Sequence, residues 1–335
     1  MTTRIAINGF GRIGRMVLRA LCARPEMDLE VVAINDLTPH STNAHLFQYD
    51  SVHGPFGGTC RLEESTLFVG DHKIALLSNP KPEQLPWGDL KVDIVFECSG
   101  RFATKEDASA HLKAGAKRVL VSAPATGADA TVVFGVNHHT ITKETLVVSN
   151  ASCTTNCLAP IAQVLHKAVG IEKGFMTTIH AYTGDQNLVD TGHKDLRRAR
   201  AATLSMIPSS TGAARAVGLV LPELAGRIDG TAVRVPTSNV SLVDLKFVSA
   251  YPTTVEAVNN ALRVAAQGVL AGILHVEDKP LVSCDFNGNP HSSIVDSLET
   301  QVIDGTFVRV AAWYDNEWGF SNRMLDTASA MARTL

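Results

Sequence analysis

Short apolar runs alternate with helix-compatible stretches through the first 150 residues of the chain. The runs, rich in Val, Ile and Leu, lie at residues 4–9, 29–36, 92–100, 117–125 and 145–152, with helix-compatible stretches at 15–25 and 107–116. Strands that are apolar on both faces and separated by helices are typical of a parallel sheet covered on both sides. The pattern predicts a doubly wound α/β domain, which we place at residues 1–151.

The pattern changes in the second half of the chain. Polar and apolar residues alternate along residues 230–248, and the segments 281–287 and 306–319 share this character. Such alternation favours an antiparallel sheet with one face covered by helices. We therefore expect a second domain of the α+β class at residues 152–316.

One long segment, residues 181–210, fits neither pattern. It has no clean periodicity and is rich in Asp, Lys and Arg. Long irregular segments in compact domains are usually functional or disordered. We expect a functional loop here, with a solvated loop as the alternative.

Composition and charge narrow the class of protein. A chain of 335 residues with 45% apolar residues can bury a core in each of two domains. A formal net charge of −3 is too near neutral to make nucleic acid or a membrane the expected partner. The N-terminal segment lacks the features of a secretory signal, and no apolar run reaches about 18 residues. With six cysteines in this context, we expect a soluble, cytoplasmic protein with reduced thiols.

The sequence INGFGRIG contains a candidate dinucleotide-binding turn. Gly9, Gly11 and Gly14 have G-x-G-x-x-G spacing between an apolar strand and a helix, where free N–H groups can bind a pyrophosphate. Asp36 ends the next predicted strand, where its carboxylate can accept hydrogen bonds from the ribose hydroxyls of NAD. The alternative is a structural glycine turn beside an aspartate at the end of a strand.

The stretch ASCTTNCLAP contains two cysteines, Cys153 and Cys157. Helical spacing of the apolar residues that follow puts Cys153 at or near a helix N-terminus, which stabilises a thiolate and lowers the thiol pKa. No metal motif surrounds the pair, and a disulfide within one helical turn is awkward. Packing explains Cys157, but the polar neighbours of Cys153 favour a chemical role.

Seven segments together resemble the phosphorylating glyceraldehyde-3-phosphate dehydrogenases: INGFGRIGR, ASCTTNCLAP, HAYTGDQ, HKDLRRARAA, STGAARAVG, VRVPT and WYDNEWGFSNR. The similarity runs in order from Arg4 to about Ala330. It implies a Rossmann NAD-binding domain, a catalytic domain built on a mostly antiparallel sheet, and a C-terminal helix, residues 317–335, that returns to the first domain. It also implies a homotetramer.

The resemblance further implies the oxidative phosphorylation of D-glyceraldehyde 3-phosphate to 1,3-bisphosphoglycerate, a step of glycolysis and gluconeogenesis, with reduction of NAD. In this chemistry a cysteine thiohemiacetal becomes a thioester, which inorganic phosphate cleaves. Cys153 matches the family's nucleophile and His180 its base. Thr183 and Arg234 match the residues that hold the substrate's phosphate, and Arg198 lies between the two phosphate sites. The residues around inorganic phosphate match Ser152, Thr154, Thr211 and Gly212.

The cofactor contacts are carried over in the same way. Besides Gly9, Gly11, Gly14 and Asp36, the family's dinucleotide contacts match Arg12, Ile13, Ser99, Gly100, Ser122 and Asn316. No metal is implied. Thr191 and Gly192 stand where NAD-specific members commonly have a Leu-Pro pair, so exclusion of NADP depends more heavily on Asp36.

Two other functions are compatible with parts of the sequence. Erythrose-4-phosphate dehydrogenase is a close relative that uses water on the thioester, and residues 281–296 resemble it. Thr183 and the intact SSTGAA segment favour the phosphorylating enzyme. A non-catalytic dinucleotide- or RNA-binding protein could share the fold, but Cys153 and His180 are both present and no basic stripe with interleaved aromatic residues occurs.

Overall fold

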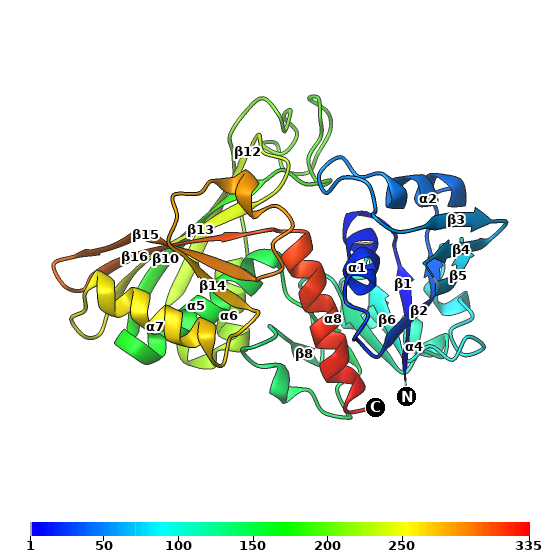
Figure 1. Cartoon of the computed structure of the whole chain (residues 1–335), viewed down its shortest axis with the longest axis horizontal. Helices are drawn as coiled ribbons and strands as arrows, with labels where there is room; N and C mark the ends of the chain where they lie inside the picture. The colour runs from blue at the N-terminus through cyan, green and yellow to red at the C-terminus, as the bar shows by residue number, and fades with distance from the viewer. Residues whose placement is uncertain (1, 71) are drawn as a thin grey trace. The chain divides into compact units, whose positions relative to one another are not determined.

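The computed structural model describes residues 2–70 and 72–335, which form two compact units (Figure 1). The first unit contains the residues up to Val132, His138–Ser152 and Ser321–Leu335, and the second contains Val133–Asn137 and Cys153–Phe320. No helix among the described residues combines the length and apolar character needed to cross a membrane.

The first unit is built on a nine-stranded sheet in the order β3-β4-β5-β2-β1-β6-β7-β9-β8. Its strands are β1 (Thr3–Asn8), β2 (Leu29–Asn35), β3 (Cys60–Glu63), β4 (Thr66–Val69), β5 (His72–Leu77), β6 (Ile94–Glu97), β7 (Arg118–Val121), β8 (Ala130–Thr131) and β9 (Val147–Ser149). All neighbours from β5 to β8 are parallel, while β3, β4 and β5 pair antiparallel. The predicted mostly parallel sheet is confirmed, and the antiparallel extension is an addition to it.

Helices of the first unit follow the strands as expected for α/β connections. They are α1 (Arg12–Cys22), α2 (His40–Gln48), α3 (Lys105–Ala108) and α4 (Ala110–Lys113), and most of α8 (Trp318–Ala332) also belongs to this unit. Ile5, Ala6 and Ile7 of β1 are fully buried, so the central strand lacks the polar alternation of a sheet with one solvated face. The sheet therefore brings the carboxyl ends of β1, β2 and β6 to one edge.

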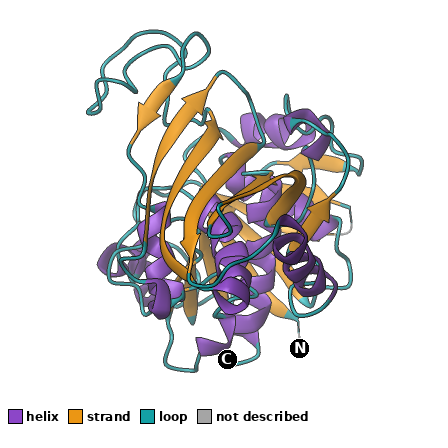
Figure 2. Ribbon diagram, turned by 90° about the vertical axis from the view of Figure 1, so that its left-hand side faces the viewer, coloured by secondary structure: helices purple, strands orange, loops and turns teal. Residues whose placement is uncertain are grey.

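The second unit contains a seven-stranded sheet in the order β11-β12-β10-β13-β16-β15-β14, whose long strands are prominent in Figure 2. Its strands are β10 (Ile171–Ala181), β11 (Ile207–Ser209), β12 (Ile228–Val235), β13 (Ser241–Ser249), β14 (Leu274–Glu277), β15 (Ser293–Ile303) and β16 (Phe307–Tyr314). The β10–β12 and β14–β15 pairs are parallel and the other pairs antiparallel, which confirms a mostly antiparallel sheet.

Helices α5 (Cys153–Val169), α6 (Ala213–Val220) and α7 (Val255–Gln267) pack against strands of this sheet. Residues of β13 alternate between buried and half-buried, as the sequence pattern predicts for a strand with one covered face. Helix α5 begins at Cys153 and continues through Pro160. The second unit therefore presents the first turn of α5 and the carboxyl ends of β10 and β12 as possible positions for a site.

One predicted strand-like segment is wrong. Residues 281–287 form a 3-10 turn at Ser283–Phe286 instead. The Asp285 carboxylate accepts a hydrogen bond from the Val282 N–H at 2.8 Å, which closes the chain into a turn. Local side-chain capping therefore outweighs the apolar pattern here.

Candidate functional site

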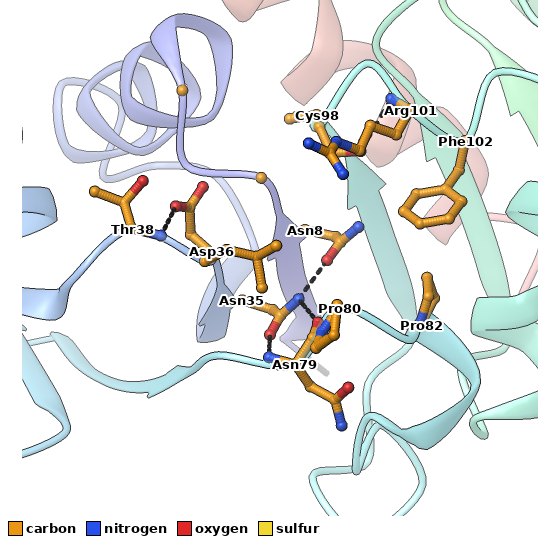
Figure 3. A pocket seen from close by; sticks show the side chains of 14 residues that line it. Asn8, Asn35, Asp36, Thr38, Asn79, Pro80, Pro82, Cys98, Arg101 and Phe102 are labelled. Carbon is orange, nitrogen blue, oxygen red and sulfur yellow. Dashed lines mark hydrogen bonds between the residues drawn. The ribbon is translucent and has the colours of Figure 1, made fainter.

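A pocket of about 290 Å3 opens at the carboxyl edge of the first unit's sheet (Figure 3). Its volume is at the lower end of the roughly 300–1,000 Å3 of small-molecule sites. The residues that line it are Asn8, Gly9, Gly11, Asn35, Asp36, Leu37, Thr38, Asn79, Pro80, Pro82, Cys98, Ser99, Arg101 and Phe102. Four predicted cofactor residues, Gly9, Gly11, Asp36 and Ser99, therefore share one cavity.

The three glycines of the turn differ in what surrounds them. A Cβ on Gly9, which has a φ of +92°, would lie 2.4 Å from the backbone nitrogen of Ser99, and one on Gly14 would lie 2.2 Å from the Gly9 carbonyl oxygen. The fold therefore leaves no room for a side chain at Gly9 or at Gly14. A Cβ on Gly11 would meet no atom within 4 Å, so its surroundings leave space for a ligand. Gly11 precedes the first residue of α1, where helix N–H groups favour a pyrophosphate.

Asp36 is held as a carboxylate on the wall of this pocket. Its Oδ2 accepts from the Phe10 N–H at 2.7 Å and its Oδ1 from the Thr38 N–H at 2.8 Å. Burial opposes the charged form, but these hydrogen bonds outweigh burial and lower the pKa of Asp36. The Asp36 carboxylate can still accept further hydrogen bonds, such as those from the hydroxyls of a ribose.

The remaining predicted cofactor residues lie outside the pocket lining. Arg12 forms an ion pair with Asp50, and Ile13 follows it in the first turn of α1. Gly100 has a φ of +72°, and Ser122 donates its backbone N–H to the Glu97 carbonyl at 2.9 Å. Asn316 belongs to the second unit, where its Oδ1 accepts from the Ser241 hydroxyl at 2.8 Å.

The two predicted catalytic residues lie next to each other in the second unit. Cys153 is the first residue of α5, His180 is near the end of β10, and the Cys153 Sγ and His180 Nε2 atoms are 3.6 Å apart. The His180 Nδ1 lies 2.6 Å from the Ala181 carbonyl oxygen, which can only accept. Nδ1 therefore carries a proton, and the neutral ring turns its accepting Nε2 toward the thiol.

Burial shifts both groups toward their neutral forms. It raises the pKa of the Cys153 thiol above its usual value of 9.0, although Thr154 and Arg234 act in the opposite direction. It also lowers the pKa of His180 to about 4. The lowering of the thiol pKa that the helix N-terminus predicts is therefore wrong, because desolvation is the larger effect. A thiolate and an imidazolium formed together attract each other, so transfer of the proton to Nε2 avoids a single buried charge.

Tyr314, which the sequence interpretation missed, holds the predicted catalytic pair in place. Its hydroxyl is 2.9 Å from the Thr154 Oγ1 on α5 and 2.8 Å from the Thr178 Oγ1 on β10. Its ring packs edge-on against His180, with ring centroids 6.0 Å apart. One buried side chain thus fixes the start of α5 against the strand that carries His180. The signal was present in the segment WYDNEWG, but nothing in the sequence shows what this tyrosine contacts.

Two of the predicted phosphate ligands are in direct contact. Arg234 faces His180 across the β10–β12 pair, and its Nη1 donates to the Thr183 Oγ1 at 2.9 Å. The buried Arg234 Nε has no hydrogen-bond partner. Burial and the nearby charge of Arg198 both lower the pKa of Arg234. Two neighbouring guanidinium groups and an unused donor fit an anion.

Arg198 lies in the irregular segment and is tied to the loop before α6. Its Nη1 donates to Asp185 at 2.5 Å, and its Nη2 donates to the Ser210 carbonyl at 3.3 Å. Thr211 and Gly212 follow directly, and the Thr211 Oγ1 accepts from the Ala213 N–H at 3.1 Å. Ser152 ends the His138–Ser152 segment of the first unit and directly precedes Cys153 in the chain. The structure thus connects Arg198 to the predicted phosphate-binding loop through a residue that the sequence did not single out, Ser210.

Cys157, the second cysteine of the ASCTTNCLAP stretch, lies in different surroundings from Cys153. It is fully buried, with its sulfur 3.6 Å from the Ser293 Oγ, and burial raises its pKa to about 12. Within residues 2–70 and 72–335, no cluster of three or more His, Cys, Asp or Glu side chains could hold a metal ion. The surroundings of Cys157 are those of a packed core thiol.

Comparisons with known proteins agree with this geometry. Residues 3–105 match the model of the glyceraldehyde 3-phosphate dehydrogenase NAD binding domain, and residues 152–316 match that of the C-terminal domain. The chain belongs to the glyceraldehyde-3-phosphate dehydrogenase family. It is 63% identical to the enzyme of that name from Xanthobacter flavus over 99% of both chains, and 61% identical to that of Cereibacter sphaeroides over 100% of both. Identity to the Geobacillus stearothermophilus enzyme is 54% over 99% of both.

The glycine turn gives a matched pair of variants. Gly14→Ala should lower the free energy of unfolding by about 2–4 kcal/mol, because its Cβ would collide with the Gly9 carbonyl. Gly11→Ala should change stability by less than about 1 kcal/mol but weaken NAD binding roughly tenfold or more, because it fills the open space above the turn. Denaturant unfolding and calorimetric NAD titration measure both. Equal NAD affinities of Gly11→Ala and wild type would contradict this assignment.

Asp36 should control the choice of coenzyme. We expect the wild type to prefer NAD, and Asp36→Ala to raise the ratio of NADP to NAD use roughly tenfold, because the carboxylate repels a 2′-phosphate. Asp89→Ala, which removes an exposed carboxylate outside the pocket lining, is the control. Steady-state kinetics with both coenzymes give the ratio. A wild type that prefers NADP would show that another residue controls the choice.

Replacing His180 should slow alkylation of Cys153 without preventing it. In His180→Asn the buried thiol must lose its proton to water, so the iodoacetamide rate at pH 7 should fall about tenfold or more. The rate should then keep rising above pH 9, because the pKa of the thiol is raised. His275→Asn, on β14, is the control. The measurement is the rate of Cys153 alkylation from pH 6 to 10 in wild type and both variants. An unchanged rate at pH 7 in His180→Asn would exclude His180 as the proton acceptor.

Proposed function

We propose that this chain oxidises D-glyceraldehyde 3-phosphate with NAD and inorganic phosphate to give 1,3-bisphosphoglycerate. The observation that carries the proposal is the contact between the Cys153 thiol and the accepting Nε2 of His180. Arg234 lies next to this pair; its side chain is half-buried, and its Nε–H has no hydrogen-bond partner. A nucleophile, its base and an anion-binding group are the parts that a phosphorylated aldehyde needs.

The residues of the first unit fit NAD. The open space at Gly11, the N-terminus of α1 and the ionised Asp36 would hold its pyrophosphate and ribose. When bound, the nicotinamide accepts the hydride that leaves the substrate carbon. Asn316, fixed by Ser241, is proposed to orient the carboxamide.

Cys153 begins the reaction by attack on the aldehyde carbon. Its proton passes from Sγ to the Nε2 of His180, which lies 3.6 Å away, as the thiohemiacetal forms. The imidazolium is then placed to give this proton from Nε2 to the oxygen of the thiohemiacetal. The neutral Nε2 can take the proton back from that hydroxyl when hydride leaves the carbon. The Nδ1–H bond to the Ala181 carbonyl keeps the ring oriented throughout.

Arg234 and Thr183 are proposed to hold the phosphate that the substrate carries, and Arg198 to serve both phosphates. Inorganic phosphate would bind among Ser152, Thr154, Thr211 and Gly212 and attack the thioester. Erythrose-4-phosphate dehydrogenase is not favoured, because the relatives are named as glyceraldehyde-3-phosphate dehydrogenases at up to 63% identity over the full chain.

The irregular segment supports the proposed homotetramer. Leu188, Val189, Leu196, Leu204 and Met206 are 70–83% exposed. Large apolar side chains gathered in one exposed segment are typical of an interface with another chain. The six free cysteines, among them the exposed Cys284, support a reducing, cytoplasmic location.

Initial rates of NADH formation test the proposed function. With glyceraldehyde 3-phosphate and NAD, turnover should depend on inorganic phosphate and should vanish in Cys153→Ser. Cys157→Ser should keep most of the activity, because that thiol is a packed one. Equal steady rates with and without phosphate would contradict the phosphorylating reaction, and equal losses in the two variants would contradict the assignment of the nucleophile.

Arg234→Leu should separate phosphate recognition from chemistry. The loss of a charge-assisted hydrogen bond of about 1.5–3 kcal/mol should lower kcat/KM for glyceraldehyde 3-phosphate by about 10- to 150-fold. Unphosphorylated glyceraldehyde should be much less affected. Arg215→Leu, which removes an exposed arginine of α6, is the control. Equal losses on both aldehydes would show that Arg234 is structural.

A further inference from the structure

A buried carboxylate, Glu97, ends strand β6 beneath the dinucleotide pocket. It is 2% exposed. Its Oε1 accepts from the Ser99 N–H at 2.8 Å and from the Ser99 hydroxyl at 2.5 Å. Its Oε2 accepts from the Asn8 Nδ2 at 2.6 Å and lies 2.9 Å from the His111 Nε2. Four donors therefore fill the accepting positions of one carboxylate.

The orientation of His111 follows from its second partner. His111 and Trp87 are both fully buried, and the Trp87 Nε1–H donates to the His111 Nδ1 at 3.0 Å. An indole nitrogen can only donate, so Nδ1 is the acceptor and the proton is on Nε2, directed at Glu97. The ring is thus fixed from both sides, and the Glu97 carboxylate is held in one position.

The same network continues to the floor of the pocket (Figure 3). The Asn35 Nδ2 donates to the Asn8 Oδ1 at 2.7 Å and to the Asn79 carbonyl at 3.0 Å, and the Asn35 Oδ1 accepts from the Asn79 N–H at 2.9 Å. Asn8, Asn35, Asn79 and Ser99 all line the cavity. The network that includes Glu97 therefore joins the carboxyl ends of four strands, β1, β2, β5 and β6.

Both hydrogen-bond donors of Ser99 are directed at Glu97. Ser99 also approaches the glycine turn closely, since a Cβ on Gly9 would lie 2.4 Å from its backbone nitrogen. A shift of Ser99 toward the turn would therefore collide with Gly9, the first glycine of the predicted pyrophosphate turn. A polar contact of Ser99 with a dinucleotide would compete with Glu97.

We propose that Glu97, oriented by His111, is a positioning residue for NAD that sets cofactor affinity by holding Ser99 and Asn8 in place. The proposal rests on the proposed NAD-dependent function. Glu97→Gln keeps the shape of the side chain but turns one acceptor into a donor that faces other donors. The pocket walls should then lose their fixed spacing, while Cys153 and His180 keep their contact.

The test combines Glu97→Gln with Ser99→Ala in a double-mutant cycle. Glu30→Gln, which alters a half-exposed glutamate of β2 beside Arg4, is the matched control. NAD dissociation constants are measured by calorimetry, and kcat is measured at saturating NAD. We expect Glu97→Gln to weaken NAD binding about tenfold or more, with kcat within twofold of wild type. Ser99→Ala should weaken binding alone but add less to Glu97→Gln than it costs in the wild type, because the Ser99 hydroxyl is one of the groups that Glu97 holds.

The outcomes separate the inference from the proposed function. Unchanged NAD affinity in Glu97→Gln, a kcat that falls as much as the affinity, or additive losses in the double variant would each overturn the positioning role. If Glu97→Gln does not fold, His111→Phe decides, because it removes one donor to Glu97 at a residue outside the pocket lining. Weaker NAD binding with kcat within twofold of wild type supports the role, and unchanged binding overturns it. A wild type that binds no NAD would refute the proposed function itself.

Discussion

The burial of the Cys153 thiol against the His180 imidazole is the constraint on which the second unit depends. A thiol in this position resists ionisation, and an imidazole there resists protonation. The free-energy cost of charging either group is low only if the other becomes charged at the same time. The Cys153 Sγ and the His180 Nε2 must therefore stay within hydrogen-bond distance. Tyr314 holds them together, because its hydroxyl joins the helix that carries the thiol to the strand that carries the imidazole. Arg234, in register with His180, adds a positive charge that favours the thiolate.

Charged groups of the first unit are also stabilised by their neighbours, and here the charged groups are carboxylates. Asp36, Asp50 and Glu97 are charged groups removed from most of their water, and each is surrounded by donors. Satisfied in this way, a buried carboxylate fixes the backbone around it instead of destabilising it. Asp36 fixes the chain after β2, and Glu97 the turn after β6. Asp36 is itself part of the pocket lining, and Glu97 bonds to the lining residues Asn8 and Ser99, so movement of these residues would cost hydrogen bonds to a carboxylate.

Much of this could be predicted from the sequence. The glycine spacing and the strand before it located the dinucleotide turn, and helical periodicity located the start of α5 near Cys153. The role of His180 required the family resemblance, because an isolated histidine at a strand end has no distinguishing pattern. The assignments of individual site residues remain predictions that the variants described above can test.

What the sequence could not show are contacts between distant residues. Thr154 and Tyr314 are 160 positions apart, and Asn8 and Glu97 are 89 apart. Such pairs leave no local periodicity, so Tyr314, Glu97 and His111 were missed. The direction of the thiol pKa was wrong for a related reason, because desolvation depends on packing from several elements. The turn at Ser283–Phe286 was missed because a single side-chain cap decided it.

The most direct test of the central claim is peptide mass spectrometry of the enzyme quenched in acid after mixing with glyceraldehyde 3-phosphate and NAD in the absence of phosphate. We expect a phosphoglyceroyl adduct on the peptide that contains Cys153, and its disappearance when phosphate is added before the quench. An adduct on another cysteine, or no adduct while NADH accumulates, would contradict the account.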